Sequence, residues 1–79
     1  EAELKMIIEE SNVLKKIEQE QFAEARQILP VQIKKARKAG KENTAALQLL
    51  ALLDYREHHY DKALKYLLTV ERYHQRKDA

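Results

Sequence analysis

The stretch FAEARQIL at residues 22–29 is matched by YDKALKYL at residues 60–67, 38 positions further along the chain. Each stretch places an aromatic residue first, an alanine three positions later and a leucine four positions after that. Apolar residues at spacings of three and four form one face of an α-helix. Because a self-similar period of this size is typical of helical-hairpin repeats, the sequence predicts a short helical repeat protein.

The composition agrees with one small helical domain. The 79 residues include one glycine, one proline and no cysteine, and their net charge is +2. A chain without cysteine has no disulfides and no thiolate metal sites. The longest apolar run, at residues 45–53, is too short to cross a bilayer, and no signal-peptide pattern is present. We therefore expect no membrane partner and a cytoplasmic location, and we expect the chain, which starts at Glu1, to be a fragment of a longer protein.

We expect four antiparallel helices in one domain spanning residues 1–79, with a first hairpin at 2–39 and a second at 43–75. The expected helices are 2–19, 21–39, 43–57 and 60–75, and residues 76–79 are expected to fray. Gly40 can end the second helix in a left-handed conformation. Pro30 lies inside that helix, and we expect one kinked helix because the apolar face continues past it. The third helix is apolar on nearly all sides, which places it at the centre.

The repeated pattern resembles the second helix of the tetratricopeptide repeat, which opens with an aromatic residue followed by an alanine and a bulky residue. The matching residues are Phe22, Ala25 and Leu29, and again Tyr60, Ala63 and Leu67. The period is 38 residues rather than the usual 34, and Asp54 stands where the family commonly has tyrosine. The resemblance implies an all-α fold of two helix-turn-helix hairpins, a fragment of a solenoid that binds other proteins.

Two packing registers are open for the first helix of each hairpin. Counting back from Tyr60 by the family spacing gives Leu47, Leu50, Ala51 and Asp54 in the second hairpin. The same count in the first hairpin gives Glu9, Asn12, Val13 and Lys16, which is a poor apolar set. We favour a turn that is shorter by one residue, because it gives Val13, Leu14 and Ile17 and then Ala51, Leu52 and Tyr55.

In that favoured register, the first helices would line a concave face, as the resemblance implies. This face would include Ile7, Glu10, Glu18, Gln48, Leu49 and Arg56. Gln48, Leu49 and Arg56 are therefore candidate partner-binding residues. The family's clamp for a C-terminal carboxylate uses lysine and asparagine, and Glu10, Leu14, Gln48 and Leu52 stand where it would need them.

The sequence offers no catalytic, metal or cofactor site. His58 and His59 are adjacent and point in different directions, and His74 is a helix length away, so we expect no zinc site. No glycine-rich phosphate loop, Ser-His-Asp set or HExxH motif is present. We therefore expect a protein that is not an enzyme and that has no cofactor.

Basic residues near the end of the second helix suggest an alternative function in binding nucleic acid. They are Lys34, Lys35, Arg37, Lys38 and Lys41. Helical spacing spreads them around the helix rather than along one stripe, and positive charge is favourable at a helix C-terminus. We therefore keep nucleic acid as the runner-up partner.

Surplus apolar residues are the main functional signal. Within this sequence the fourth helix has no following helix to pack on, so we expect an open apolar face along Leu64, Tyr66 and Leu68, or along Leu47 and Leu53 on the third helix. We therefore expect a protein–protein interaction module that binds a peptide or helix, or that forms a homo-oligomer. A structural segment of a longer solenoid without a site of its own is the further alternative.

Overall fold

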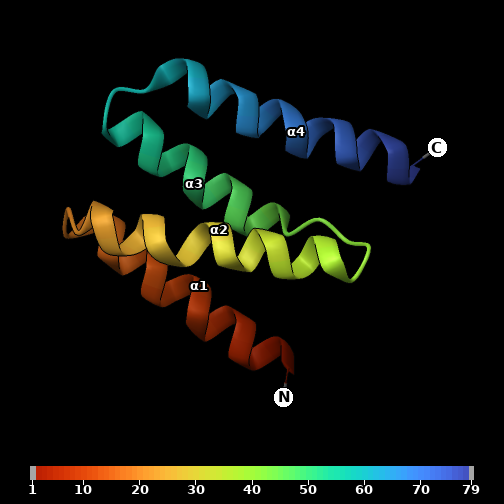
Figure 1. Ribbon diagram of the computed structural model, residues 1–79, viewed down its shortest axis with the longest axis horizontal. Helices are drawn as coiled ribbons and strands as arrows, with labels where there is room; N and C mark the ends of the chain where they lie inside the picture. Colours follow the sequence, from red (N-terminus) through yellow and green to blue (C-terminus); the bar gives the residue numbers. More distant parts are fainter. Residues whose placement is uncertain (1, 79) are drawn as a thin grey trace.

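The computed structural model describes residues 2–78, with side chains at 4, 5 and 8–76, and this part of the chain forms four α-helices and no strand. The helices are α1 (Ala2–Glu18), α2 (Phe22–Lys38), α3 (Thr44–Arg56) and α4 (Tyr60–Asp78) (Figure 1). Helices α1 and α2 form one hairpin, and α3 and α4 form the other. The prediction of an all-α fold of helical hairpins is confirmed.

The two hairpin turns have the same backbone geometry, 38 residues apart. Glu20 and His58 both have left-handed backbone conformations, with φ of 63° and 66°. After Glu20, the N–H of Gln21 donates to the carbonyl of Lys16 at 2.8 Å, and the equivalent bond recurs after His58. This bond pattern is the Schellman motif, which lets a helix end and the chain reverse within a few residues. The 38-residue period seen in the sequence therefore also appears in the backbone conformation of the two turns.

The connection between the hairpins contains the residues expected to end α2 and to begin α3. Gly40 has a φ of 74°, and the N–H of Lys41 after it donates to the carbonyl of Ala36 at 3.0 Å. Asn43 is the N-cap of α3, and its side-chain oxygen accepts from the N–H of Ala46 at 3.0 Å. A glycine at the end of one helix and an asparagine before the next therefore fix both bounds.

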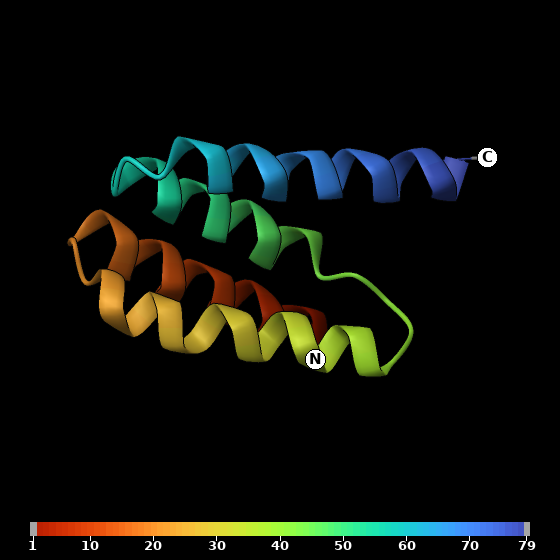
Figure 2. The same cartoon turned by 45° about the horizontal axis from the view of Figure 1, so that its top comes forward.

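Helix α3 lies at the centre, as its apolar circumference predicted. It contacts α1, α2 and α4, whereas α4 makes no comparable backbone contact with the first hairpin over residues 2–78. Figure 2 shows α4 lying along α3, on the side away from α1 and α2. The molecule is flat, with principal extents of 37 × 34 × 17 Å. One hairpin is therefore stacked on the other, and α4 forms one end of the stack.

The core lies where the second hairpin meets the first. Its largest fully buried side chains are Val13, Ile17, Leu29, Leu47, Leu53 and Asp54. Burying one large aliphatic side chain contributes about 1.5–3 kcal/mol, so the five aliphatic residues of this set dominate the packing energy. The side chains of Met6 and Ile7 lie outside the described ones.

The packing register of α3 differs from the one favoured from the sequence. Tyr55 is 60% exposed and Leu52 is only half-buried, whereas Asp54 is fully buried. The buried set of α3 includes Leu47, Leu50, Ala51 and Asp54. The other register, counted back from Tyr60, is therefore the correct one in the second hairpin. In the first hairpin Val13 and Ile17 are buried as expected, but Leu14 is 36% exposed.

Helices α2 and α4 are each continuous. Helix α2 is one helix that includes Pro30, as predicted, and the proline is exposed. Helix α4 continues to Asp78, beyond the predicted end at 75, so the expected fraying is wrong for residues 76–78. No glycine or proline follows His74 to end the helix. Residue 79 lies outside the described chain.

Candidate functional site

Exposed apolar side chains gather on the outer side of α4. Leu64, Leu67 and Leu68 are 57%, 49% and 39% exposed, and Tyr60 is 54% exposed. Positions spaced by three and four lie on one side of a helix. Tyr55, at the end of α3, extends this surface, because the centroids of the Tyr55 and Tyr60 rings are 5.4 Å apart in an edge-on contact. We call Tyr55, Tyr60, Leu64, Leu67 and Leu68 the end face.

The internal repeat shows that part of the end face corresponds to a covered surface in the first hairpin. Ile17 and Leu29 are fully buried and belong to the core cluster that includes α3. Their equivalents 38 positions later are Tyr55 and Leu67, which are 60% and 49% exposed. The same positions are thus buried in one hairpin and exposed in the next, because the second hairpin packs only on the first.

The six residues proposed from the sequence as partner-binding do not form one site. Leu64 and Leu68 lie on the end face, whereas the alternative open face along Leu47 and Leu53 is wrong, because both residues are buried in the core. Tyr66 is half-buried, packs against the core and lines a hollow between α2 and α4. Gln48 and Leu49 line a separate groove on α3, and Arg56 is exposed at the end of that helix. Sequence reasoning assigned Tyr55, Tyr60 and Leu67 to helix packing, since nothing in their spacing separates a covered face from an open one.

A groove between α1 and α3 lies where the concave face was expected. It has a volume of about 400 Å³ and is lined by Glu10, Ser11, Leu14, Ala45, Gln48, Leu49 and Leu52. Of the other residues predicted for this face, Glu18 and Arg56 are exposed but do not line the groove, and the side chain of Ile7 is not described. The groove is a shallow surface between two first helices, with a mixed polar and apolar lining.

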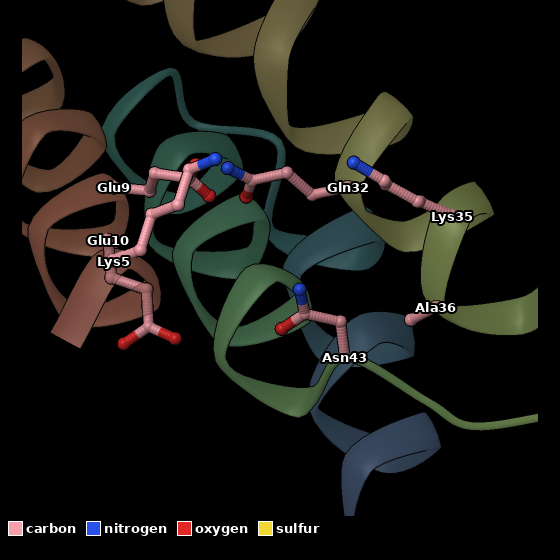
Figure 3. Close-up of a pocket in the computed structure, with 7 residues that line it drawn as sticks. All are labelled: Lys5, Glu9, Glu10, Gln32, Lys35, Ala36 and Asn43. Carbon is pink, nitrogen blue, oxygen red and sulfur yellow. The ribbon is translucent and has the colours of Figure 1, made fainter. Parts of the chain in front are cut away.

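A second, more polar pocket of about 340 Å³ opens between α1, α2 and the start of α3. Figure 3 shows Lys5 and Glu9 extending from α1 toward Gln32 on α2, while Glu10 points elsewhere. The remaining lining residues are Lys35, Ala36 and Asn43. Asn43 already caps α3 through its side-chain oxygen, so that oxygen is not available to a ligand without loss of the cap.

The basic residues of α2 do not form one patch. Lys34 and Arg37 line the hollow that faces α4, whereas Lys35 lines the pocket that faces α1. The Nε of Arg37 also donates to the Oε1 of Glu42 at 2.7 Å, which partly neutralises it. Lys38 and Lys41 are exposed. A phosphate backbone would therefore meet these cations on different sides of α2.

An ion-pair cluster fastens the two hairpins together near the turns. The Nη2 of Arg26 on α2 lies 2.6 Å from the Oδ1 of Asp54 and 2.7 Å from the Oε1 of Glu57. The Nδ1 of His59 lies 3.4 Å from the same Asp54 oxygen. Asp54 is fully buried, and its second carboxylate oxygen, Oδ2, has no hydrogen-bond partner. Arg26 is therefore the main ion-pair partner of the buried Asp54.

Two opposing effects act on the pKa of Arg26. Burial alone would lower it, but hydrogen bonds to Asp54 and Glu57, together with their negative charges, outweigh burial and raise the pKa. A raised pKa in a base adds stability that is present below its unfolded-state pKa and is lost only at higher pH. Arg26 therefore stays charged throughout the physiological range, and the cluster is a structural contact between the hairpins.

Among the described side chains, at 4, 5 and 8–76, no group of three His, Cys, Asp or Glu residues is placed to hold a metal ion. None of the helices within that range is long and apolar enough to cross a membrane. Comparison with protein-family models, with curated proteins and with solved structures found no match. The function is therefore inferred from the geometry of the chain itself.

Proposed function

We propose that this chain is a non-enzymatic protein-interaction module that binds an apolar α-helix on its end face. The observation that carries the proposal is the contrast between Ile17 and Leu29, which α3 covers, and their exposed equivalents Tyr55 and Leu67. Large contiguous apolar surfaces mark sites of interaction with other proteins. The stripe on α4 is spaced to contact a second helix along several turns.

The resemblance to the tetratricopeptide repeat supports the same proposal, since that family consists of stacked helical hairpins that bind other proteins. The stacking of α3 on both helices of the first hairpin agrees with such a solenoid. The cytoplasmic location and the absence of enzymatic activity stay predictions.

The groove between α1 and α3 is a less favourable binding site than the end face. It includes Leu14, Leu49 and Leu52, but Glu10, Ser11 and Gln48 interrupt its apolar lining. The end face instead presents three leucines and two tyrosines, each at least 39% exposed. Aromatic and leucine side chains bury the most apolar area per residue, so a partner on the end face would be bound with a larger favourable free energy of burial.

The internal repeat also suggests the probe with which to test the proposal. A peptide of residues 43–59 would present the face of α3 that covers the first hairpin. Arg26 pairs with Asp54 in the contact between the hairpins, but on the end face the equivalent position holds Leu64, which cannot form an ion pair. The peptide should therefore carry Asp54→Leu, so that no unpaired carboxylate is placed against the end face. Binding of the fluorescein-labelled peptide to the whole chain is measured by fluorescence anisotropy.

We expect the labelled peptide to bind with micromolar affinity, and we expect Leu64→Glu on the protein to weaken binding at least about tenfold, since it places a charge in an apolar contact. Val31→Glu is the matched control because Val31 is 63% exposed on α2, away from the end face. Equal binding to both variants, or no binding to the unmodified chain at any concentration up to about 1 mM, would contradict helix binding on the end face.

A further inference from the structure

We propose that the partner helix comes from a second copy of the chain, so that two α4 helices pack antiparallel through their end faces about a two-fold axis near Leu67. This inference rests on the proposed function and names its partner. Three observations carry it: the polarity of α1, the placement of two opposite charges on α4, and the spacing of the leucines.

Helix α1 cannot take the place of α3 on another copy. The buried residues Leu47, Leu50 and Leu53 of α3 cover the first hairpin, and each is at most 5% exposed. The equivalents 38 positions earlier are Glu9, Asn12 and Lys15, and all three are exposed polar residues. Stacking α1 of one copy on the end face of the next would therefore bury unpaired charges against apolar side chains.

The difference between α1 and α3 determines which symmetry the assembly can have. A head-to-tail contact between copies would use two different faces, and repetition of it would produce an open chain of molecules. The α1 face carries exposed charges at Glu9 and Lys15 beside the exposed Leu4 and Ile8, so burying it is unfavourable, and the more favourable arrangement is one in which the end face meets itself. Self-complementary contacts of this kind have two-fold symmetry and close after two copies.

The charges beside the apolar stripe fit such an antiparallel pair. Asp61 and Arg72 are both exposed on α4 and lie 11 residues apart, which is close to three helical turns, so they are on the same side of the stripe. In an antiparallel two-fold pair centred between Tyr66 and Leu67, Asp61 of each copy lies opposite Arg72 of the other. Two equivalent attractive pairs therefore form at the border of the contact.

The same centre brings the leucines into contact. Leu67 lies beside the two-fold axis and therefore near its own copy, while Leu64 of one molecule lies near Leu68 of the other. These residues are exposed in the single chain, at 57% for Leu64, 49% for Leu67 and 39% for Leu68. The register that pairs the charges thus also pairs the apolar side chains. Tyr60 of one copy then lies near Glu71 of the other, toward each end of the overlap.

Cysteine cross-linking tests the two-fold axis directly, because the chain has no cysteine of its own. We expect Leu67→Cys to form a disulfide-linked dimer under mild oxidation, since a residue beside a two-fold axis lies near its counterpart. Val31→Cys on α2, where the native side chain is 63% exposed against 49% for Leu67, is the control and should stay predominantly monomeric. Equal cross-linking of the two variants, or none in either, would overturn the proposal.

Charge exchange tests the register. Asp61→Lys alone places two lysines opposite arginines, and we expect it to weaken the dimer about five- to thirtyfold at low ionic strength. Arg72→Glu alone should have a similar effect, and the double variant D61K/R72E should return to within about twofold of the original dissociation constant. A double variant that is as weak as the two single effects combined would overturn this register, provided circular dichroism shows that all variants remain helical.

The peptide experiment separates this inference from the proposed function. If the chain stays monomeric at millimolar concentration but binds the α3-type peptide at Leu64, the second copy is the wrong partner and the helix-binding function stands. If the chain neither dimerises nor binds the peptide, both proposals fail. Dimerisation that Leu64→Glu abolishes and Val31→Glu does not, together with the Leu67 cross-link, supports both.

Discussion

At the residue scale, Asp54 is the side chain that departs most from what its type predicts. A carboxylate is expected at the surface, yet Asp54 is fully buried between the hairpins and depends on Arg26 for its ion pair. Burying a charge is unfavourable unless a partner compensates for the lost hydration. The two residues are 28 positions apart, in different hairpins, so the contact reports directly on how the hairpins stack.

Removing Arg26 should therefore destabilise the fold far more than its partial exposure suggests. We expect Arg26→Met to lower the free energy of unfolding by about 3 kcal/mol, near the lower end for a broken buried pair because Arg26 is one third exposed. The control is the double variant R26L/D54L, which removes both charges and should recover most of that loss. Urea denaturation followed by circular dichroism measures all three proteins. A single variant with unchanged stability would mean that Asp54 is not buried as described.

The left-handed turn residues give a second test at this scale. Glu20 has a φ of 63° without being glycine, whereas Gly40 occupies the same kind of position with a φ of 74°. We expect Glu20→Gly to raise stability by about 1 kcal/mol, because glycine adopts this conformation without strain. Gly40→Ala should lower it by a similar amount through backbone strain alone, since an added Cβ would meet no atom within 4 Å. Thermal unfolding measures both, and shifts of the same sign would contradict the two turn conformations.

At the element scale, the bounds of the helices could be read from the sequence almost completely. Every predicted bound agrees with the structure within one residue, except the end of α4. The signals were local: the apolar spacings, Gly40 at the end of α2 and Asn43 before α3. The α4 terminus was missed because the sequence beyond residue 75 contains neither a stop signal nor a strong apolar requirement to continue.

The register of α3 could not be predicted, because it depends on a residue in another hairpin. Local reasoning prefers Tyr55 over Asp54 as a core residue, because it does not include the ion pair between Asp54 and Arg26. The exposure of Leu67 was missed for a similar reason, since its equivalent Leu29 is fully buried. A helix face is identified by spacing, but whether another element covers it depends on the rest of the assembly.

Truncating neighbouring leucines in α3 tests the observed register. Leu53 is fully buried, whereas Leu52 is half-buried beside the groove. We expect Leu53→Ala to lower the free energy of unfolding by about 2–5 kcal/mol, because it leaves a cavity in the core. Leu52→Ala should cost clearly less, about 1 kcal/mol, since solvent can reach the site. The opposite order in chemical denaturation would favour the register that was first expected from the sequence.

At the scale of the whole molecule, the two ends of the hairpin stack have different chemistry. The α1 end presents Glu9, Asn12 and Lys15 beside the exposed Leu4 and Ile8, whereas the α4 end presents a surface of three leucines and two tyrosines. A polar outer face on the last helix keeps the end of a helical repeat soluble, and the outer face of α4 is instead apolar around Leu64. This asymmetry is the reason to expect that association proceeds through α4 and stops at two copies.

The most direct test of this account is sedimentation equilibrium of the unmodified chain, Leu64→Glu and Val31→Glu over a wide range of concentration. The monomer has a mass of 9.3 kDa, so a two-copy assembly is readily distinguished. We predict that the unmodified chain and Val31→Glu approach twice the monomer mass, and that Leu64→Glu remains a folded monomer. Identical behaviour of the two glutamate variants, or a chain that remains monomeric throughout, would contradict the end face as the site of self-association.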